Sequence, residues 1–481
     1  MSRAAGNGLG GWRLRIVVLT ALVALGVGVV AAYGALGSHD TATGTGALAS
    51  EAGGDYNTAD GYQALSANTT GVANTAVGES ALFSNSTGTL NTAVGQHALY
   101  SNTTGFSNTG VGASALSSNT TGGYNTAVGL SALSSNSTGQ QNAAAGAFAL
   151  LSNTTGSNNT AGGTGALQSN ITGSENTAAG AAALVLNTTG THNTAVGFQA
   201  LMTNATGEDN TAVGHGALAF STADDNTAYG YNALYSNTTG LKNSAIGSAA
   251  LFSNTTGENN TASGEQALTH NTTGETNMAS GYRALLENTE GDANTAAGGQ
   301  ALYSNTIGND NTAAGSTALY SNTTGDENTA VGHDALRMNS TGASNTAVGV
   351  AAGFGATPNT SGSSNTFVGH RAAPGTATQL NNATAVGANA VVSQSDSLVL
   401  GAAGVSVGID TASPQSRLQV GNGMSTSYGE YVQLPLVKTA AKPPTADCNT
   451  TTYVGRLVLQ WVSNTVIKLW ACSLTGKWVK I

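Results

Sequence analysis

Seven histidines and three acidic pairs are the side chains that could bind a metal ion or transfer a proton. The histidines are His39, His97, His192, His215, His270, His333 and His370, and their spacing matches no zinc-binding pattern. The acidic pairs are Glu208-Asp209, Asp224-Asp225 and Asp326-Glu327, and they lack the Gly-Gly-x-Gly-x-Asp pattern of calcium-binding repeats. The sequence therefore predicts no metal site, and it favours calcium binding only weakly.

The sequence shows no recognisable catalytic motif. The sequence contains no nucleophile–base constellation, no phosphate-binding loop and no cofactor motif. A trimeric acyltransferase of the hexapeptide-repeat type needs an aliphatic residue about every six places. The recurring Val and Leu of this chain do not follow that spacing. We therefore expect that the protein is not an enzyme and carries no cofactor.

A repeated unit must position nearly all of these side chains. The unit has 17 residues, reads close to Asn-Thr-Ala-Val-Gly-x-x-Ala-Leu-x-Ser-Asn-Thr-Thr-Gly-x-x, and recurs over residues 57–356. One residue is missing before Asn226, where Ser221-Thr-Ala-Asp replaces the usual Asn-Thr-Thr-Gly arm. A fixed period of this size is typical of a stacked repeat protein, in which each unit contacts mainly its neighbours.

The composition narrows the class of partner. Only 8% of the residues are charged, against about 25% in an ordinary globular domain. Residues 40–420 carry 22 acidic and 5 basic residues, whereas residues 421–481 carry two acidic and six basic. An acidic array repels phosphate groups, so we expect no nucleic-acid partner. The strict register and the 40% apolar content favour an ordered array over a disordered one.

Each unit is predicted to be a coil of β-structure. Asn-Thr-Ala-Val predicts one short strand, and Ala-Leu-x-Ser predicts a second. Glycines at the fifth and fifteenth positions suit turns with positive φ or a close approach of backbones. Stacked coils would align the asparagines of the first and twelfth positions into amide ladders. Representative positions of this repeat ladder are Asn74, Gly78, Ala81 and Leu82.

Two features of the unit leave alternatives open. Arms such as Asn68-Thr-Thr and Asn102-Thr-Thr also match the N-glycosylation sequon. The core of one Leu, one Val and two Ala per unit is lean for a lone solenoid. We therefore expect several chains to associate around the Ala and Leu columns, most simply as a homotrimer, with a monomer as the alternative.

A family resemblance follows from these residues. Asn-Thr-Ala-Val-Gly followed by Ala-Leu resembles the head repeat of the trimeric autotransporter adhesins, the YadA-like heads. The resemblance covers residues 57–401 and implies a left-handed parallel β-roll wound from three chains. Residues 407–420 look like a segment of phage tail-fibre-like and other trimeric fibre proteins. The sequence departs from the adhesin family because it shows neither a heptad stalk nor a membrane β-barrel segment.

The N-terminal residues carry an export signal. Arg3, Arg13 and Arg15 precede an uncharged run at 16–36, which is long enough to cross a bilayer as a helix. The arginines favour a cytoplasmic N-terminus. The run is either an uncleaved membrane anchor or a cleaved signal peptide, and in both cases we expect the following residues to be exported.

The C-terminal residues have a different composition. Strands are predicted at 453–462, 465–472 and 477–481, and the segment is basic and aromatic. Cys448 and Cys472 predict one disulfide in an exported chain, with two unpaired thiols as the alternative. The tryptophans form either a recognition tip or the core of a small trimer-capping domain. They are Trp461, Trp470 and Trp478.

These predictions combine into one layout and one function. The expected segments are a basic segment (1–15), a signal anchor or signal peptide (16–36), a linker (37–56), the 17-residue array (57–356), degenerate coils (357–404), a connector (405–427) and a β tip (428–481). We expect a trimeric adhesive fibre at the cell surface or secreted, with a protein or glycan as its ligand. The alternatives are a purely structural fibre and an ice-binding solenoid. The adjacent threonines of Asn-Thr-Thr, which point to opposite faces of a strand, disfavour ice binding.

Overall fold

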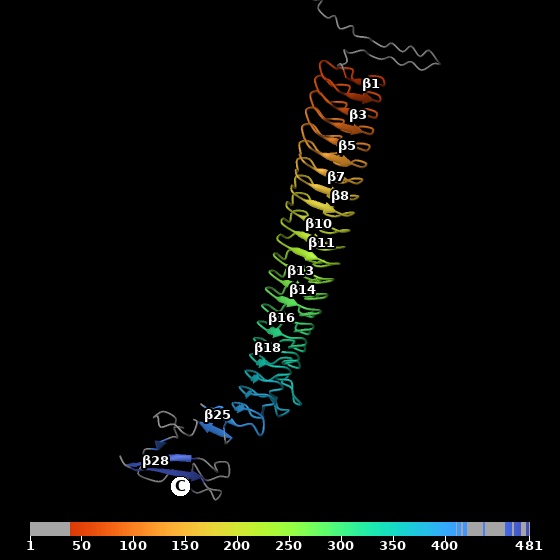
Figure 1. Ribbon diagram of the computed structural model, residues 1–481. Coiled ribbons are helices and arrows are strands. Elements are labelled where there is room, and N and C mark those ends of the chain that lie inside the picture. Colours follow the sequence, from red (N-terminus) through yellow and green to blue (C-terminus); the bar gives the residue numbers. More distant parts are fainter. Residues whose placement is uncertain are drawn as a thin grey trace, which may run out of the picture. The chain divides into compact units, whose positions relative to one another are not determined.

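The computed structural model describes residues 39–409, 411–414, 417–420, 436–437, 457–463, 466–472 and 478–480. The chain divides into two units, Met1–Thr256 and Gly257–Ile481. Within each unit, coils with one short strand apiece follow one another in sequence order (Figure 1). All regular elements in the described ranges are strands, which confirms the predicted all-β class. No helix in these ranges is long and apolar enough to span a membrane, and the anchor predicted at 16–36 lies outside them.

Thirteen strands of the first unit pair in parallel with the strand of an adjacent coil. The register is in phase with the repeat, since Thr75 lies opposite Thr92 and Ala76 opposite Ala93. The strands are β1 (Thr41–Thr43), β2 (Thr58–Asp60), β3 (Thr75–Val77), β4 (Thr92–Val94), β5 (Thr109–Val111), β6 (Thr126–Val128), β7 (Ala143–Ala145), β8 (Thr160–Gly162), β9 (Thr177–Ala179), β10 (Thr194–Val196), β11 (Thr211–Val213), β12 (Thr227–Tyr229) and β13 (Ser244–Ile246). The predicted parallel solenoid is therefore confirmed.

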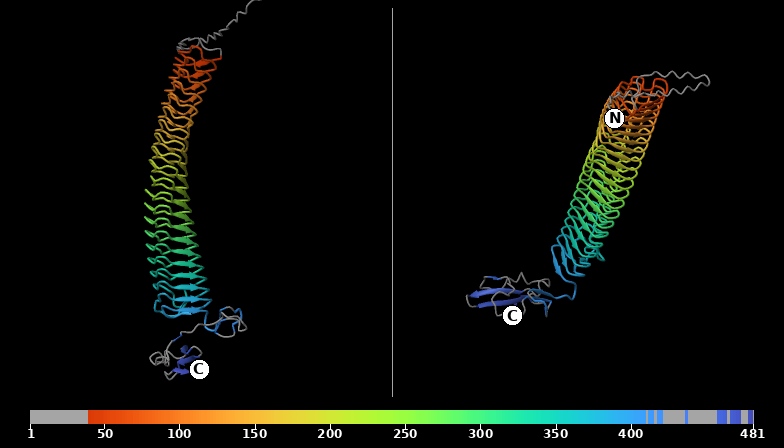
Figure 2. Two further views of the ribbon diagram at one scale, coloured as in Figure 1. Left: turned by 90° about the vertical axis from the view of Figure 1, so that its left-hand side faces the viewer. Right: turned by 45° about the horizontal axis from the view of Figure 1, so that its top comes forward.

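The second unit repeats this pattern and then changes. Its stacked strands are β14 (Thr261–Ser263), β15 (Met278–Ser280), β16 (Thr295–Ala297), β17 (Thr312–Ala314), β18 (Thr329–Val331), β19 (Thr346–Val348), β20 (Thr366–Val368), β22 (Thr384–Val386) and β24 (Leu398–Leu400). Two smaller parallel pairs join β21 (Ala373–Pro374) to β23 (Val391–Val392) and β25 (Val407–Ile409) to β26 (Leu418–Val420). Figure 2 shows the strands of each unit lying one above another on one side of the coils.

The last strands confirm the three predicted near the C-terminus. They are β28 (Leu457–Ser463), β29 (Val466–Cys472) and β30 (Trp478–Lys480), which pair antiparallel in that order. A short additional strand, β27 (Leu436–Val437), pairs in parallel with β28.

The core of each coil differs from the prediction at one column. Ala76, Ala81 and Leu82 are fully buried, as expected. Val77 is 36% exposed, and the valines at the same position of other coils are similarly exposed, so the predicted burial of Val is wrong. Successive residues of a strand point to opposite faces, so a three-residue Thr-Ala-Val strand with Ala inside must place Thr and Val outside.

The predicted second strand is also wrong. The Ala-Leu-x-Ser segments form turns, and Leu82 has a φ of 51°. This left-handed backbone breaks the extended chain and turns the Leu side chain into the core. The turns still bond from coil to coil, because the amide of Leu82 donates to the carbonyl of Ala98 at 3.0 Å.

Burial of the Ala and Leu columns removes the stated reason for a trimer. These columns lie fully inside each chain's own coils, so they cannot form an interface with other chains. An association of chains would have to use the outer Thr and Val columns instead. The left-handed sense of the coil and the homotrimer stay predictions.

The array begins earlier than the sequence predicted. Strand β1 pairs with β2 in register, and Ala47 and Leu48 are buried like their counterparts in later coils. The described part of the predicted linker (37–56) is therefore the first coil. The degenerate coils predicted at 357–404 also belong to the stack, since β20, β22 and β24 continue the parallel pairing.

Candidate functional site

Buried asparagines form two ladders along the inside of the coils. At the first position, the Asn74 side-chain amide donates to Asn57 Oδ1 at 3.2 Å and to the carbonyl of Gly88 at 2.8 Å. At the twelfth position, Asn85 donates to Asn68 Oδ1 at 2.8 Å. The same contacts recur from coil to coil, and the predicted amide ladders are confirmed. Along the regular coils, the buried amides thereby have the partners that burial of a polar group requires.

The ladder explains the sequon-like arms. Asn68 and Asn102 are fully buried, as are the other asparagines of this column. A glycosylated asparagine must lie at the surface, because the attached sugar is bulky. Within the described coils, these asparagines therefore form structural hydrogen bonds and do not serve as glycan acceptors.

Both ladders run in one direction and need a special first step. Each asparagine donates to the coil before it, so the first described coil must supply an acceptor at each of the two positions. Asp40 and Glu51 occupy these two positions. Asp40 Oδ1 accepts the amide of Asn57 at 2.7 Å, and Glu51 Oε2 accepts the side-chain amide of Asn68 at 2.6 Å. Carboxylates accept without donating, so both side chains fit the end of a ladder.

Replacing the buried cap Glu51 by Gln should loosen the first coil. The Glu51 carboxylate accepts the amides of Gly53 and Gly54 as well as Asn68, and a Gln side chain would turn an NH2 group toward one of these donors. A lost partner of a buried group costs about 1–3 kcal/mol, which corresponds to roughly 10- to 100-fold faster amide exchange. Hydrogen-exchange mass spectrometry of peptides covering residues 39–70 measures this change. The exposed Glu79→Gln is the control, and equal effects of the two variants would contradict the cap.

The shortened coil at Asn210–Asp225 breaks one ladder. Ser221 takes the place of the twelfth-position asparagine, and Asn237 donates to its hydroxyl at 3.2 Å. Ser221 offers no amide to the previous coil, and Asn204 Oδ1 is buried without a hydrogen-bond partner. At the first position the backbone amide of Asn226 still donates to Asn210 Oδ1 at 3.0 Å, while the Asn226 side-chain amide donates to the carbonyls of Asp224 and Gly240.

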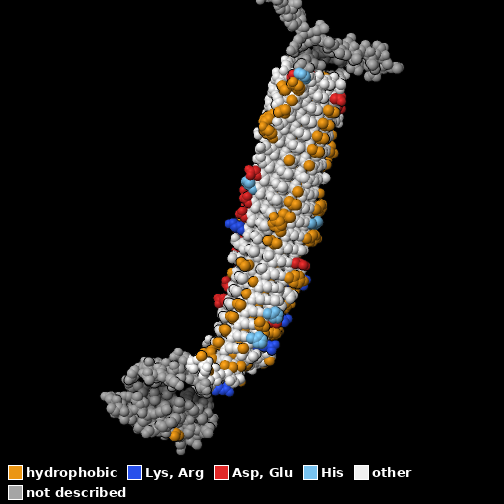
Figure 3. All heavy atoms as spheres, in the orientation of Figure 1, with side chains coloured by type: hydrophobic (Ala, Val, Ile, Leu, Met, Phe, Trp, Pro, Cys, Tyr) orange, Lys and Arg blue, Asp and Glu red, His pale blue; other side chains and the backbone are white. Residues whose placement is uncertain are grey.

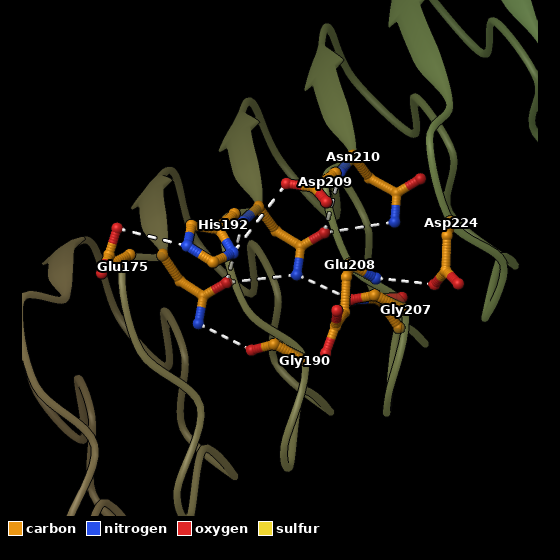
Figure 4. Close-up of polar contacts among 11 residues, drawn as sticks. Glu175, Gly190, His192, Gly207, Glu208, Asp209, Asn210 and Asp224 are labelled. Carbon is orange, nitrogen blue, oxygen red and sulfur yellow. Dashed lines mark hydrogen bonds and ion pairs between the residues drawn. The ribbon is translucent and has the colours of Figure 1, made fainter. Parts of the chain in front are cut away.

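Acidic side chains and one histidine line the outside of these coils. His192 Nε2 lies 3.3 Å from Glu175 and its Nδ1 lies 3.9 Å from Asp209, one coil to each side (Figure 4). Asp224 Oδ1 accepts the amide of Glu208 at 2.8 Å. The side chains of His192, Glu175 and Asp209 are all more than half exposed, so these ion pairs contribute little stability.

Metal binding at these side chains has no support in the geometry. In the parts of the chain that the structure describes, no group of three His, Cys, Asp or Glu side chains converges as a metal site would require. Asp292 and Asp326 also have a structural role, because each accepts the amide of the corresponding residue one coil earlier. These acidic side chains thus bond neighbouring coils to each other on the outer surface.

The outer face of the strands is regular and nearly uncharged. Eleven of the thirteen strands β1–β13 begin with Thr, the exceptions being Ala143 and Ser244. Asp60 is the one charged residue in these strands. Thr therefore forms one outward-facing column beside a mixed second column, in which Val occupies six of the thirteen positions, and the strand separation of about 4.8 Å sets the spacing. Figure 3 shows that charged side chains are few among the side chains visible on the coils.

The predicted C-terminal site residues are only partly described. Trp461, Trp470 and Trp478 lie in β28, β29 and β30, and Trp478 pairs with Cys472 in the backbone register. Their side chains lie outside what the structure describes, as does Cys448. The disulfide and the recognition tip therefore stay predictions.

Comparison with known proteins gives no relative for this chain. No family model, no curated protein and no solved structure matches it. The resemblance to YadA-like heads and to phage fibre segments therefore rests on the quoted residues alone, and the function has to be argued from the coils themselves.

Proposed function

We propose that this protein is a fibrous structural protein of the cell exterior, on which outward-facing residues provide adhesive contacts. One observation carries the proposal: most coils repeat the same interior of Asn, Ala and Leu, while most of the variation falls on exposed positions. A stacked array of this kind gains length without a new core, because each coil contacts only its neighbours. Low charge and dense internal hydrogen bonding suit a durable spacer more than a catalyst.

The export signal of the sequence supports the proposed location. The basic residues before the apolar run at 16–36 favour transfer of the following coils across the membrane. The ligand class is a protein or glycan, and the acidic coils disfavour nucleic acid.

Immunogold electron microscopy of cells that express the full chain tests this proposal. We expect an antibody against the repeat to label the cell exterior, and we expect the purified full chain to form elongated particles in negative stain. Label confined to the cytoplasm, or compact particles, would contradict the proposal.

The outer Thr column favours ice binding as a second candidate function. A flat array of threonines at a constant spacing offers hydroxyl and methyl groups that can order water in a lattice. The first threonine of the Asn-Thr-Thr arm does not contribute, since Thr103 Oγ1 donates to the carbonyl of Thr120 in the next coil. A purified full chain that shows thermal hysteresis and shaped ice crystals would support this function, and unmodified freezing would eliminate it.

A further inference from the structure

The longest coil of the described array lines a pocket together with its two neighbouring coils. Successive first-position asparagines are 20 residues apart at Asn345 and Asn365, as the hydrogen bond between them shows. In this coil Gly353 replaces the core Leu, and Phe367 is fully buried beside it. The aromatic ring thereby fills the space of the missing Leu, and the extra residues from Phe354 onward lie partly exposed.

The pocket has a volume of about 490 Å³ and combines charged and apolar walls. Its lining includes His333, Asp334, Val350, Phe354, His370 and Arg371. A neighbouring hollow of about 360 Å³ shares Gly355, Ala356 and Arg371 with it. Arg371 therefore lines both spaces. Volumes in this range are those of small-molecule sites and accommodate one or two sugar rings.

The electrostatics of the pocket favour an anion. The Asp334 carboxylate already has partners, because it lies 3.3 Å from Arg337 and 3.1 Å from His333 and accepts the hydroxyl of Thr317 at 2.6 Å. Arg337 also lies over the ring of Phe354, at 5.8 Å from the centroid. The exposed Arg371 has no ion pair within the described residues. Its guanidinium is the group best suited to bind a carboxylate through two parallel hydrogen bonds.

The surrounding charge distribution points the same way. Residues 40–327 carry 19 acidic and 2 basic residues, whereas residues 328–420 carry 3 of each. An anionic ligand is therefore repelled along most of the array and not at these coils. Figure 3 shows histidine and basic side chains gathered on the C-terminal coils.

From this geometry we propose that the pocket binds an acidic sugar. The carboxylate lies against Arg371, the hydroxyls bond His333 and Asp334, and the apolar face of the ring lies against Phe354 and Val350. The site deepens the proposed adhesive function and rests on it for its biological meaning. Binding itself is independent of where the protein is displayed.

Isothermal titration calorimetry with the full chain tests the pocket. The probes are methyl β-D-glucuronide, its neutral counterpart methyl β-D-glucoside, and acetate. We expect the glucuronide to bind, and we expect the glucoside and acetate to bind with affinities lower by about tenfold or more. The glucoside lacks the carboxylate that contacts Arg371, and acetate lacks the sugar ring. Equal binding of the glucuronide and the glucoside, equal binding of the glucuronide and acetate, or no detectable glucuronide binding would overturn the proposal.

Two variants locate the site. Arg371→Gln removes the carboxylate partner, and we expect the affinity for glucuronide to fall about 10- to 100-fold. Val350→Phe fills the pocket without changing a charge, and an aromatic residue is tolerated at this coil position, as Phe198 shows in the same repeat phase. Both variants should retain the circular dichroism of the parent chain.

Arg283→Gln, which removes a basic residue of the same unit outside the pocket, is the matched control. An equal loss of affinity in this variant would reduce the effect to net charge and overturn the assignment. A failure of these tests leaves the proposed fibrous function intact, because immunogold labelling measures that function separately.

Discussion

Replacing Gly298 by Ala should destabilise the stacked coils by about 2–5 kcal/mol. Gly298 has a φ of 142°, and an added Cβ would lie 2.6 Å from the carbonyl group of Gly315 in the next coil. A backbone conformation reserved for glycine costs a side chain about 1–3 kcal/mol, and forced overpacking adds a similar amount. Urea unfolding followed by circular dichroism measures the loss.

The neighbouring residue provides the control for this prediction. Gly299→Ala adds the same methyl group, but no atom lies within 4 Å of the new Cβ, and the φ of Gly299 is not in the positive region. We expect this variant to be neutral or more stable by about 0.4–1 kcal/mol, since alanine reduces the entropy of the unfolded chain. Similar losses for the two variants would show that the coils are not in the close contact described.

Replacing Asn136 by Ala should cost about 2–5 kcal/mol. The Asn136 side-chain amide donates to Asn119 Oδ1 at 2.8 Å and to the carbonyl of Gly139 at 3.0 Å, and its oxygen accepts Asn153 at 2.8 Å. Alanine removes the donor to Asn119 Oδ1 and one of the two bonds at the Gly139 carbonyl and at the Asn153 amide, and each unsatisfied group costs about 1–3 kcal/mol. Urea unfolding of the full chain measures the cost.

The break in the ladder supplies the comparison for Asn136. Asn204 occupies the same position, but its Oδ1 has no partner, so Asn204→Ala loses only the two bonds that its amide donates. We expect the loss in free energy of unfolding to be smaller for Asn204→Ala than for Asn136→Ala, by about 1 kcal/mol or more. An equal cost at the two positions would mean that the chain of side-chain bonds does not stabilise the coils.

The sequence alone predicted those parts of the fold that depend on strict periodicity. The asparagine ladders, the parallel register and the glycine columns follow from identical residues lying above one another. The two glycine columns serve the two expected roles. Gly78 adopts a positive φ of 129°, whereas Gly88 allows a close approach, because a Cβ there would meet Asn85 Oδ1 at 2.3 Å. Both constraints are local and act at every coil, so the pattern shows them directly.

The direction of each side chain within the coil was harder to predict. Val looks like a core residue by hydrophobicity, but the alternation of a three-residue strand places Ala76 inside and Val77 outside. The left-handed φ at Leu82 is unusual for an L-residue without a stabilising side-chain bond, so the residue pattern predicts a strand where the chain turns. Packing of the whole coil, and not local propensity, decides both.

The ends and the irregular coils were missed because they depart from the repeat. Asp40 and Glu51 replace asparagines, which hides the first coil, although Thr41-Ala42 and Ala47-Leu48 keep the repeat phase and could have revealed it. The pocket residues His333 and Arg371 belong to coils on either side of an enlarged one. Only the folded coil brings them together.

The most direct test of the stacked-coil account is a pair of deletions measured by thermal unfolding and cryo-electron microscopy. Deleting residues 125–175 removes three whole 17-residue repeats and joins Tyr124 to Asn176. We predict unchanged β-structure, a melting temperature close to that of the parent and a particle shorter by about 14 Å, three strand spacings. Deleting residues 125–183 leaves one coil of nine residues, which is too short to close, and we predict a marked loss of stability. Equal tolerance of the two deletions, or equal disruption by both, would contradict the account.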